Sequence, residues 1–384
     1  MSIKILHTSD WHLGKSIYGH SLVEDQTHFI DKIFFPTLIE AKPDLVIISG
    51  DIFDKYIAPI FAINLFNKIL TKVSNDLHIP ICIISGNHDS PERICLASDI
   101  LRQNGIYIAT NISDIFSPVE LNLNGEHVSI FLLPYFNLQT ARSFLKNENV
   151  NSIEDAYRHI LDSLKPNINK NRFNILVTHA FVTGCTCDKS QTSLQVGGSD
   201  EVGAEVFSDF DYVALGHLHS SQKAGKNGRY SGSPLHYSFD EPNKIKSFNL
   251  IEITNNDYKI TPLEIEPLHK MQTISGTFND IVNLGKTSPS DNYICVNLKD
   301  DAPIYMPMEQ LRVYFKNILT LNTNWIKVRS SNNILQKENI INRLSNPEYV
   351  FKEFLCNICL TEPTEDDIKI FNQAIIDLKK DEVK

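Results

Sequence analysis

Five short apolar runs in the first two-thirds of the chain each lead into a cluster of polar residues, and this pattern constrains the fold most. The runs are Ile3–Leu6, Leu45–Ile48, Ile81–Ile84, Ile175–Val177 and Tyr212–Leu215. Continuous runs rich in β-branched residues are typical of strands buried on both faces, in sheets flanked by helices. Helical spacing over Pro59–Val73 and Ile153–Leu164 supplies such helices. The sequence therefore predicts an α/β fold.

The polar residues that follow these runs are of the types that bind metals. They are Asp10, His12, Asp51, Asn87, His179, His217 and His219. Functional sites in α/β folds form beyond the carboxyl ends of the strands, so the five runs should deliver these side chains to one place. Mixed nitrogen and oxygen ligands suit ions such as manganese, iron or zinc better than calcium or magnesium alone. Two such ions about 4 Å apart can activate water and neutralise phosphate oxygens.

The local sequence also predicts how the site is built. Glycines at positions 50, 86 and 216 fit sharp turns where the backbone approaches the metals closely. If the Gly216–His219 segment is extended, its alternation sends His217 and His219 to the same side.

Charge and cysteine content exclude some classes of protein. The formal net charge of -10 argues against a simple DNA-coating protein. It does not exclude nucleic acid, because a cleft that gathers divalent cations needs carboxylates. The odd number of cysteines, 7 in all, fits reduced thiols in the cytoplasm, and neither Cys185-x-Cys187 nor Cys356-x-x-Cys359 has the second pair that a structural zinc site needs. We expect neither a signal peptide nor a membrane span.

Five motifs occur in the order found in the calcineurin-like metallophosphoesterases, which the chain therefore resembles. They are Asp10-x-His12, Gly50-Asp51-x-x-Asp54, Gly86-Asn87-His88-Asp89, His179 and Gly216-His217-x-His219. Longer runs narrow the resemblance to the SbcD-type exonuclease subunits, strongly over residues 1 to about 255. These runs are His7–Gly14, Gly50–Asp54, Gly86–Ser90, Asp211–His219 and Tyr230-x-Gly232-Ser233-Pro234.

The resemblance implies a four-layer sandwich of mixed sheets flanked by helices, with a two-metal centre. One ion would be held by Asp10, His12, Asp51 and His219, and the other by Asp51, Asn87, His179 and His217. His88 would protonate the leaving sugar oxygen, a role that suits a histidine. Asp54 would support its neighbours in the cleft. Manganese is the expected ion, with magnesium as the alternative. The stretch from Val182 to Val196 carries no diagnostic motif.

The same resemblance implies a function and partners. The chain would hydrolyse DNA as a 3′–5′ double-strand exonuclease and a single-strand or hairpin endonuclease, in DNA repair, recombination and replication in the cytoplasm. It would act as a homodimer within a heterotetramer that contains an SbcC-type coiled-coil ATPase. Two other functions stay open: a stand-alone phosphatase or phosphodiesterase on a small nucleotide, and a DNA-tethering scaffold with structural metals. The long extension after the catalytic core favours the nuclease.

We predict three domains: a nuclease domain over 1–266, a capping module over 267–335 and a helical tail over 336–384. The capping module should be a small α+β unit with strands at Tyr293–Leu298 and Trp325–Val328 and a helix at Met308–Leu319. Residues 267–345 hold nine Lys/Arg against six Asp/Glu. Within this stretch Lys327 and Arg329 are candidates for DNA-backbone contact, although a generic mixed-charge surface explains them equally well.

The tail should form two short amphipathic helices, one starting at Asn346-Pro347 and one capped by Thr364. By resemblance they would dock the ATPase. The helix over residues 60–73 is apolar around most of its circumference, and by resemblance it would pair across a two-fold axis. We assign packing roles to Trp11 and a hydrogen-bonded strand position to His7. The other histidines outside the motifs should have surface or packing roles.

Overall fold

The computed structural model describes residues 2–187, 201–241, 245–254, 257–324, 347–356 and 362–381. The chain forms two compact units. The first comprises residues 1–273, 291–295 and 316–320, and the second comprises residues 274–290, 296–315 and 321–384. No helix in the described part of the chain combines the length and apolar character needed to cross a membrane.

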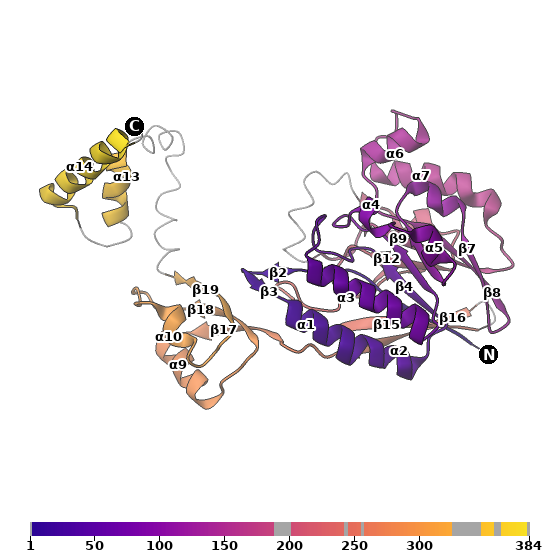
Figure 1. Ribbon diagram of the computed structural model, residues 1–384, viewed down its shortest axis with the longest axis horizontal. Coiled ribbons are helices and arrows are strands. Elements are labelled where there is room, and N and C mark those ends of the chain that lie inside the picture. The colour runs from indigo at the N-terminus through magenta and orange to yellow at the C-terminus, as the bar shows by residue number, and fades with distance from the viewer. Residues whose placement is uncertain are drawn as a thin grey trace. The chain divides into compact units, whose positions relative to one another are not determined.

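Two six-stranded mixed sheets form the centre of the first unit (Figure 1). The first sheet has the order β16 (Asp257–Ile265), β15 (Lys246–Thr254), β1 (Ile3–Thr8), β4 (Leu45–Ser49), β5 (Ile81–Ile84), β6 (Ile106–Ala109). The second has the order β13 (Gln222–Ala224), β14 (Gly228–Tyr230), β12 (Tyr212–Gly216), β9 (Phe173–His179), β8 (Glu126–Leu133), β7 (Val119–Leu123). Two-stranded pairs join β2 (Ser16–Ile17) to β3 (His20–Ser21) and β10 (Phe181–Val182) to β11 (Glu201–Val202).

Three hydrophobic cores hold the layers together. One contains buried residues of both sheets, such as Ile47 of β4 and Val177 of β9, and therefore lies between them. A second packs the first sheet against the π-helical segment Phe29–Phe34, which follows α1 (Val23–His28), and against α2 (Phe35–Ala41) and α3 (Ile60–Thr71). The third packs the second sheet against α6 (Leu138–Leu145) and α7 (Ile153–Leu164). Helices therefore cover both outer faces, as in the predicted four-layer sandwich. Short helices α4 (Pro91–Ile94) and α5 (Ser98–Arg102) follow β5.

The five predicted strands are confirmed as β1, β4, β5, β9 and β12. They are parallel within each sheet: β1 pairs with β4, β4 with β5, and β9 with β12. Every strand except β15 in the first sheet and β13 and β7 in the second therefore presents its carboxyl end in a common direction within its sheet. The predicted helix at 153–164 is α7, and the one at 59–73 is α3, which continues as a π-helical segment over Lys72–Asp76.

A third sheet has the order β17 (Met271–Gly276), β18 (Tyr293–Leu298), β19 (Ile318–Thr323), and its strands begin in the first unit and end in the second. The second unit also contains α9 (Phe278–Thr287) and α10 (Pro307–Leu311). The predicted strand at 293–298 is confirmed, but the predicted helix at 308–319 is wrong. The helix ends at Leu311, and Ile318 begins a strand whose neighbour Asn317 accepts a hydrogen bond from the Ile294 amide at 2.9 Å. A short apolar run cannot distinguish a helix from a strand by spacing alone.

The tail forms two helices, α13 (Pro347–Phe354) and α14 (Glu365–Asp381). Thr364 and Asp367 make the reciprocal bonds of the predicted capping box, since each side chain accepts a hydrogen bond from the other residue's backbone N–H. The rings of Phe351 and Phe371 stack with centroids 4.2 Å apart, so the two helices pack against each other. The predicted strand at 325–328 lies outside the described residues, and so do Lys327 and Arg329.

Candidate metal centre

Seven predicted ligands lie together where five strands end. Asp10 and His12 follow β1, Asp51 follows β4 and Asn87 follows β5, while His179 ends β9 and His217 and His219 follow β12. Carboxylates and imidazoles of this set lie within 4.8 Å of one another in two groups, Asp10–His12–His219 and Asp10–Asp51–His179. The carboxyl ends of strands from both sheets therefore build one centre, as expected for an α/β site.

The backbone at this centre is strained. Positive φ angles occur at Asp10 (55°), His12 (44°), Asp51 (52°) and His217 (104°), a region that residues with side chains rarely adopt. Hydrogen bonds hold the loops in this conformation: the Asp10 amide donates to the Gly50 oxygen at 3.0 Å and the His12 amide to the Asp51 oxygen at 2.9 Å. Strained backbone of this kind concentrates at functional sites.

Glycine is required at two positions for close approach. A Cβ at Gly216 would collide with the backbone oxygen of Ser49, and one at Gly86 would collide with the Asp51 carboxylate. Both glycines therefore let ligand-bearing loops from different strands come into contact, which fits the predicted role of these residues.

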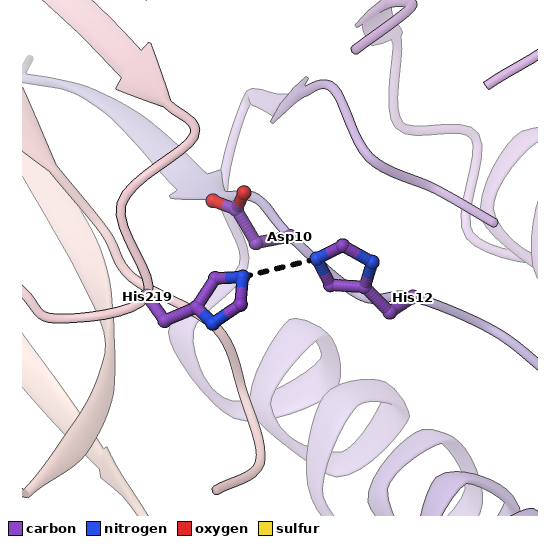
Figure 2. A group of neighbouring side chains, drawn as sticks. All are labelled: Asp10, His12 and His219. Carbon is purple, nitrogen blue, oxygen red and sulfur yellow. Dashed lines mark hydrogen bonds between the residues drawn. The ribbon is translucent and has the colours of Figure 1, made fainter. Parts of the chain in front are cut away.

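The first cluster joins Asp10, His12 and His219 (Figure 2). The Nε2 atoms of His12 and His219 face each other at 3.1 Å, and His12 Nε2 lies 3.6 Å from Asp51 Oδ2. The Asp10 carboxylate accepts hydrogen bonds from the His217 amide at 3.0 and 3.2 Å and from the Ser9 hydroxyl. These contacts fix the carboxylate beside the two imidazoles.

The second cluster joins Asp51, Asn87, His179 and His217. Asn87 Oδ1 lies 3.0 Å from His179 Nε2 and 3.1 Å from His217 Nδ1, and His179 Nε2 lies 3.5 Å from Asp51 Oδ2. His217 and His219 were expected to share one side if their segment were extended, and this condition is not met. The strand ends at Gly216 and the chain turns at His217, so the two imidazoles reach different clusters.

The donor atoms of the second cluster fit a divalent cation. His179 Nδ1 lies 2.8 Å from the backbone oxygen of Ser49, which can only accept, so Nδ1 carries the hydrogen of the neutral ring. The lone pair of Nε2 then faces the oxygens of Asn87 and Asp51, which are also acceptors. When His179 is neutral, its Nε2 lone pair and these oxygens converge, which suits a metal ion, and a carbonyl partner on the other nitrogen is the usual support for a metal-binding histidine.

Burial and neighbouring charges set the protonation states of the metal-free centre. Burial lowers the pKa of His217 to about 4 and holds the pKa values of His12 and His219 well below their ordinary value, so these imidazoles are neutral. Burial also lowers the pKa of His179, but the Asp51 carboxylate beside it raises that pKa to about 9. A proton there occupies the position that a cation would take, because ligating histidines are neutral.

His88 lies beside the clusters without joining the Asn87 cluster. Its amide donates to Asp51 Oδ1 at 3.0 Å, and its Nδ1 lies 2.9 Å from the backbone oxygen of Asp54. That oxygen only accepts, so Nδ1 is the donor and Nε2 is left to exchange a proton. The ring meets His12 edge-on with centroids 4.7 Å apart. The half-buried side chain is therefore held in one orientation next to the first cluster.

Asp54 supports the site through its backbone as well as its carboxylate. The carboxylate oxygen Oδ1 binds Lys15 Nζ at 2.6 Å and lies 3.6 Å from His12 Nδ1. The sequence did not identify Lys15, whose ammonium also lies 5.2 Å above the Tyr237 ring. It is the third residue after His12, and nothing in its local sequence distinguishes it from a surface lysine.

Three further groups around the centre were not predicted. Tyr237 donates to the Trp11 oxygen at 2.7 Å, and its ring lies 5.3 Å from His12. The buried ammonium of Lys246 donates to the His219 oxygen at 2.9 Å and to Glu241 Oε2 at 2.5 Å. Asp89, which ends one motif, accepts hydrogen bonds from the amides of Gly86, Ile52 and Phe53 and so ties two ligand loops together. Of these residues, only Asp89 could have been found from the sequence, because it ends the Gly86-Asn87-His88-Asp89 motif.

The packing role assigned to Trp11 and the hydrogen-bonded strand position assigned to His7 are confirmed. Trp11 is 1% exposed and lies edge-on to Phe29 and Phe34. His7 is buried in β1 and hydrogen-bonds through Nδ1 to the Tyr212 hydroxyl at 3.0 Å. Neither residue reaches the metal clusters.

Comparison with known proteins agrees with this architecture. The family described as calcineurin-like phosphoesterases matches residues 3–221, and the type 5 capsule protein repressor C-terminal domain (SbcD_C) matches residues 267–357. A dimetal phosphatase from Danio rerio is similar in structure, with 12% identity and a TM-score of 0.42 over 69% of this chain and 98% of that chain. The two family matches together support an SbcD-type subunit. The calcineurin-like phosphoesterase match spans more than half of this chain, and the chain therefore belongs to the calcineurin-like phosphoesterase family.

Proposed function

We propose that the chain is the nuclease subunit of an SbcCD-type complex and hydrolyses DNA phosphodiester bonds in repair and recombination. Clusters of potential metal ligands occur in one chain with a C-terminal domain of the SbcD_C family, and this combination supports the proposal most. The proposed polarity is that of a 3′–5′ double-strand exonuclease with endonuclease activity on single strands and hairpins. The proposed location is the cytoplasm.

The site residues divide into ligands and a proton donor. Asp10, His12, Asp51 and His219 would hold one ion, and Asp51, Asn87, His179 and His217 the other, with manganese preferred over magnesium. When bound, the two ions supply positive charge to the phosphate oxygens and a more acidic water. His88 Nε2 would give its proton to the leaving oxygen, because the Asp54 oxygen fixes the opposite nitrogen as a donor.

One experiment separates the nuclease from the competing functions. Plasmid and hairpin DNA are incubated with the purified chain and Mn²⁺, beside a chromogenic phosphodiester. A nuclease cuts the DNA, and a phosphodiesterase specific for small nucleotides cuts only the chromogenic substrate. A scaffold with structural metals cuts neither substrate, which would contradict the proposal.

We also propose a homodimer formed around α3. A cavity of about 800 Å³ lies between α3 and residues 90–108 and is lined by apolar side chains such as Phe66, Leu70 and Leu101. Around it, Ile60, Ile63, Leu96 and Ile100 are exposed, at 77%, 44%, 76% and 65%. Exposed apolar patches of this kind mark protein interfaces. A second copy of the chain would bury the patch across a two-fold axis.

Light scattering at micromolar concentration is expected to give the mass of a dimer for the wild-type chain. Ile63→Lys should shift the chain to a monomer, because it places a charge in the apolar interface. Ile39→Lys is the matched control, since Ile39 is 53% exposed on α2 and should leave the dimer intact. A wild-type chain that is monomeric at this concentration counts decisively against the dimer.

The tail is proposed to bind the coiled-coil ATPase by the helix-in-groove mode. Helices as short as α13 are marginal alone, so the pair needs a surface to lie on. Stacking of Phe351 on Phe371 joins the two helices, while Val350 (41%) and Ile370 (70%) stay exposed. These exposed apolar side chains suit a partner's groove.

Truncation after Ser345 is expected to preserve metal-dependent cleavage and abolish co-purification with the ATPase. In the full-length chain, Ile370→Glu should weaken co-purification, and Lys369→Gln at the neighbouring exposed position should not. If the truncated chain is insoluble or melts markedly earlier, the tail belongs to the chain's own core and the docking role fails.

The capping role of residues 267–335 stays a proposal, and so does the division at 266 and 335. Lys327 and Arg329 are still proposed to contact the DNA backbone. Reversing both charges should weaken DNA binding and flatten its salt dependence, because fewer counterions are then released. An unchanged salt slope would exclude the contact.

A further inference from the structure

The hairpin that follows His12 holds an exposed tyrosine in an unfavourable conformation. Pairing of Ser16 with Ser21 and of Ile17 with His20 leaves Tyr18 and Gly19 as a two-residue loop, with φ angles of 49° and 79°. Two-residue loops with positive φ at both positions favour Asn, Asp or Gly, and a bulky side chain there is an outlier. Tyr18 is 58% exposed, so burial of its side chain does little to offset the cost of this backbone conformation.

A second aromatic side chain lies beside this tyrosine. The rings of Tyr18 and Phe239 have centroids 5.6 Å apart and are tilted by 44°. Phe239 is partly buried and packs on the hydrophobic core of the first unit. Tyr18 and Phe239 are here called the aromatic platform. The platform therefore consists of one exposed ring and one ring that the hydrophobic core holds in place.

Both chain segments of the platform are attached to the first metal cluster. The Lys15 amide donates to the His12 oxygen at 3.0 Å, and the Leu22 amide closes the hairpin on the Lys15 oxygen at 3.0 Å. Tyr237, two residues before Phe239, places its ring 5.3 Å from His12 and 5.4 Å from His219. The platform is thus held within a few residues of the metal ligands on both segments.

Charged side chains of both signs lie near the platform, because the Lys15 ammonium is paired with Asp54 at 2.6 Å and Asp240 directly follows Phe239. Lys15 is 19% exposed, and its ammonium lies 5.2 Å from the Tyr237 ring, between the hairpin and the metal ligands in sequence. The Tyr18 hydroxyl has no hydrogen bond to any residue described in the structure, so the side chain is not held there by a polar contact of its own. An exposed aromatic ring in an unfavourable backbone conformation, on the hairpin that follows His12, suits contact with another flat ring.

We propose that the aromatic platform stacks an unpaired nucleobase of the DNA strand whose phosphodiester occupies the metal centre. Every base has a π-face, so stacking on Tyr18 tolerates any sequence. A paired base inside a duplex hides that face, and the platform therefore selects single strands, frayed ends and hairpin loops. This inference rests on the proposed nuclease function and adds to it a subsite that recognises unpaired bases.

Binding of labelled oligonucleotides to the full-length chain in Ca²⁺ tests the platform. The probes are a single-stranded DNA and a blunt duplex of the same sequence. Tyr18→Ala should weaken binding of the single strand about 5- to 150-fold, the loss expected for one stacked base, and affect the duplex much less. Tyr18→Phe should bind like the wild type. Tyr18→Leu, which keeps the bulk but not the flat ring, should lose affinity like Tyr18→Ala.

A second variant separates recognition from stability. Asn suits the left-handed position, so Tyr18→Asn should raise the melting temperature while it weakens single-strand binding. A merely structural tyrosine would lower the melting temperature when replaced. Phe144→Ala is the control for loss of an exposed aromatic, because Phe144 is 37% exposed on α6 and stacks on Phe116 with centroids 6.2 Å apart.

If the wild type cuts DNA and Tyr18→Ala binds single strands equally well, the platform alone is overturned. An equal loss on single strand and duplex also overturns it, because the contact is then not with an unpaired base. If the wild type neither binds nor cuts DNA, the proposed function fails and the platform fails with it.

Discussion

Replacing His88 by alanine is expected to reduce DNA cleavage by roughly 10²–10⁴-fold, the usual loss for a missing general acid. Both metals and the affinity for DNA should be retained. The reason is geometric: the Asp54 oxygen at 2.9 Å orients the His88 ring beside His12, and the two potential metal groups that contain Asp10 do not include His88. His88 does lie in a third such group with His12 and Asp54, so the metal content of the variant decides between the two roles. Metal analysis and single-turnover cleavage of the purified variant measure the two effects separately.

Asp51→Ala is the matched comparison and should lose metal occupancy. The Asp51 carboxylate lies 3.6 Å from His12 Nε2 and 3.5 Å from His179 Nε2, so it is the side chain that contacts both clusters. If His88→Ala is also depleted of metal, His88 is a ligand and the assigned proton-donor role is wrong.

Lys246→Met is expected to lower the melting temperature of the chain by on the order of 10 °C. The Lys246 ammonium and the Glu241 carboxylate are 2% and 0% exposed and lie 2.5 Å apart. Breaking such a buried pair typically costs about 3–5 kcal/mol, because the remaining charge is left uncompensated. The ammonium also donates to the His219 oxygen at 2.9 Å, so metal affinity should fall as well.

Two further variants test the origin of this loss. Lys68→Met removes a similar pair with Asp31 at 2.6 Å, but Lys68 is 49% exposed and the melting temperature should hardly change. Lys246→Met combined with Glu241→Gln should be more stable than Lys246→Met alone, because no unpaired carboxylate is buried. If Lys246→Met and Lys68→Met lowered the melting temperature equally, the buried pair would contribute no more to stability than the exposed pair.

The strands, and the meeting of the candidate ligands where these strands end, were predictable because both depend on local sequence. A buried parallel strand reads as a continuous apolar run, and the residue that ends it is placed by the strand itself, as His179 is by β9. The convergence of Asp10, Asn87 and His217 followed from the rule that parallel strands share a carboxyl edge. The motif order then identified the family.

What the sequence missed depends on contacts between distant segments. Lys246 reaches His219 across 27 positions, and Tyr237 reaches Trp11 across 226. The spacing of apolar residues along the sequence carries no information about such contacts. The common direction expected of His217 and His219 does not occur because the chain turns at His217, which has a φ of 104°. The helix predicted at 308–319 failed because pairing beside β18 outweighed the helical spacing of a short segment.

A manganese titration of the full-length chain, with bound metal and hairpin-DNA cleavage measured in the same samples, tests the two-metal nuclease centre most directly. Two manganese ions per chain are expected at saturation, with cleavage that rises as the second ion binds and disappears in EDTA. Saturation at one ion or none, or cleavage that persists in EDTA, would contradict the account.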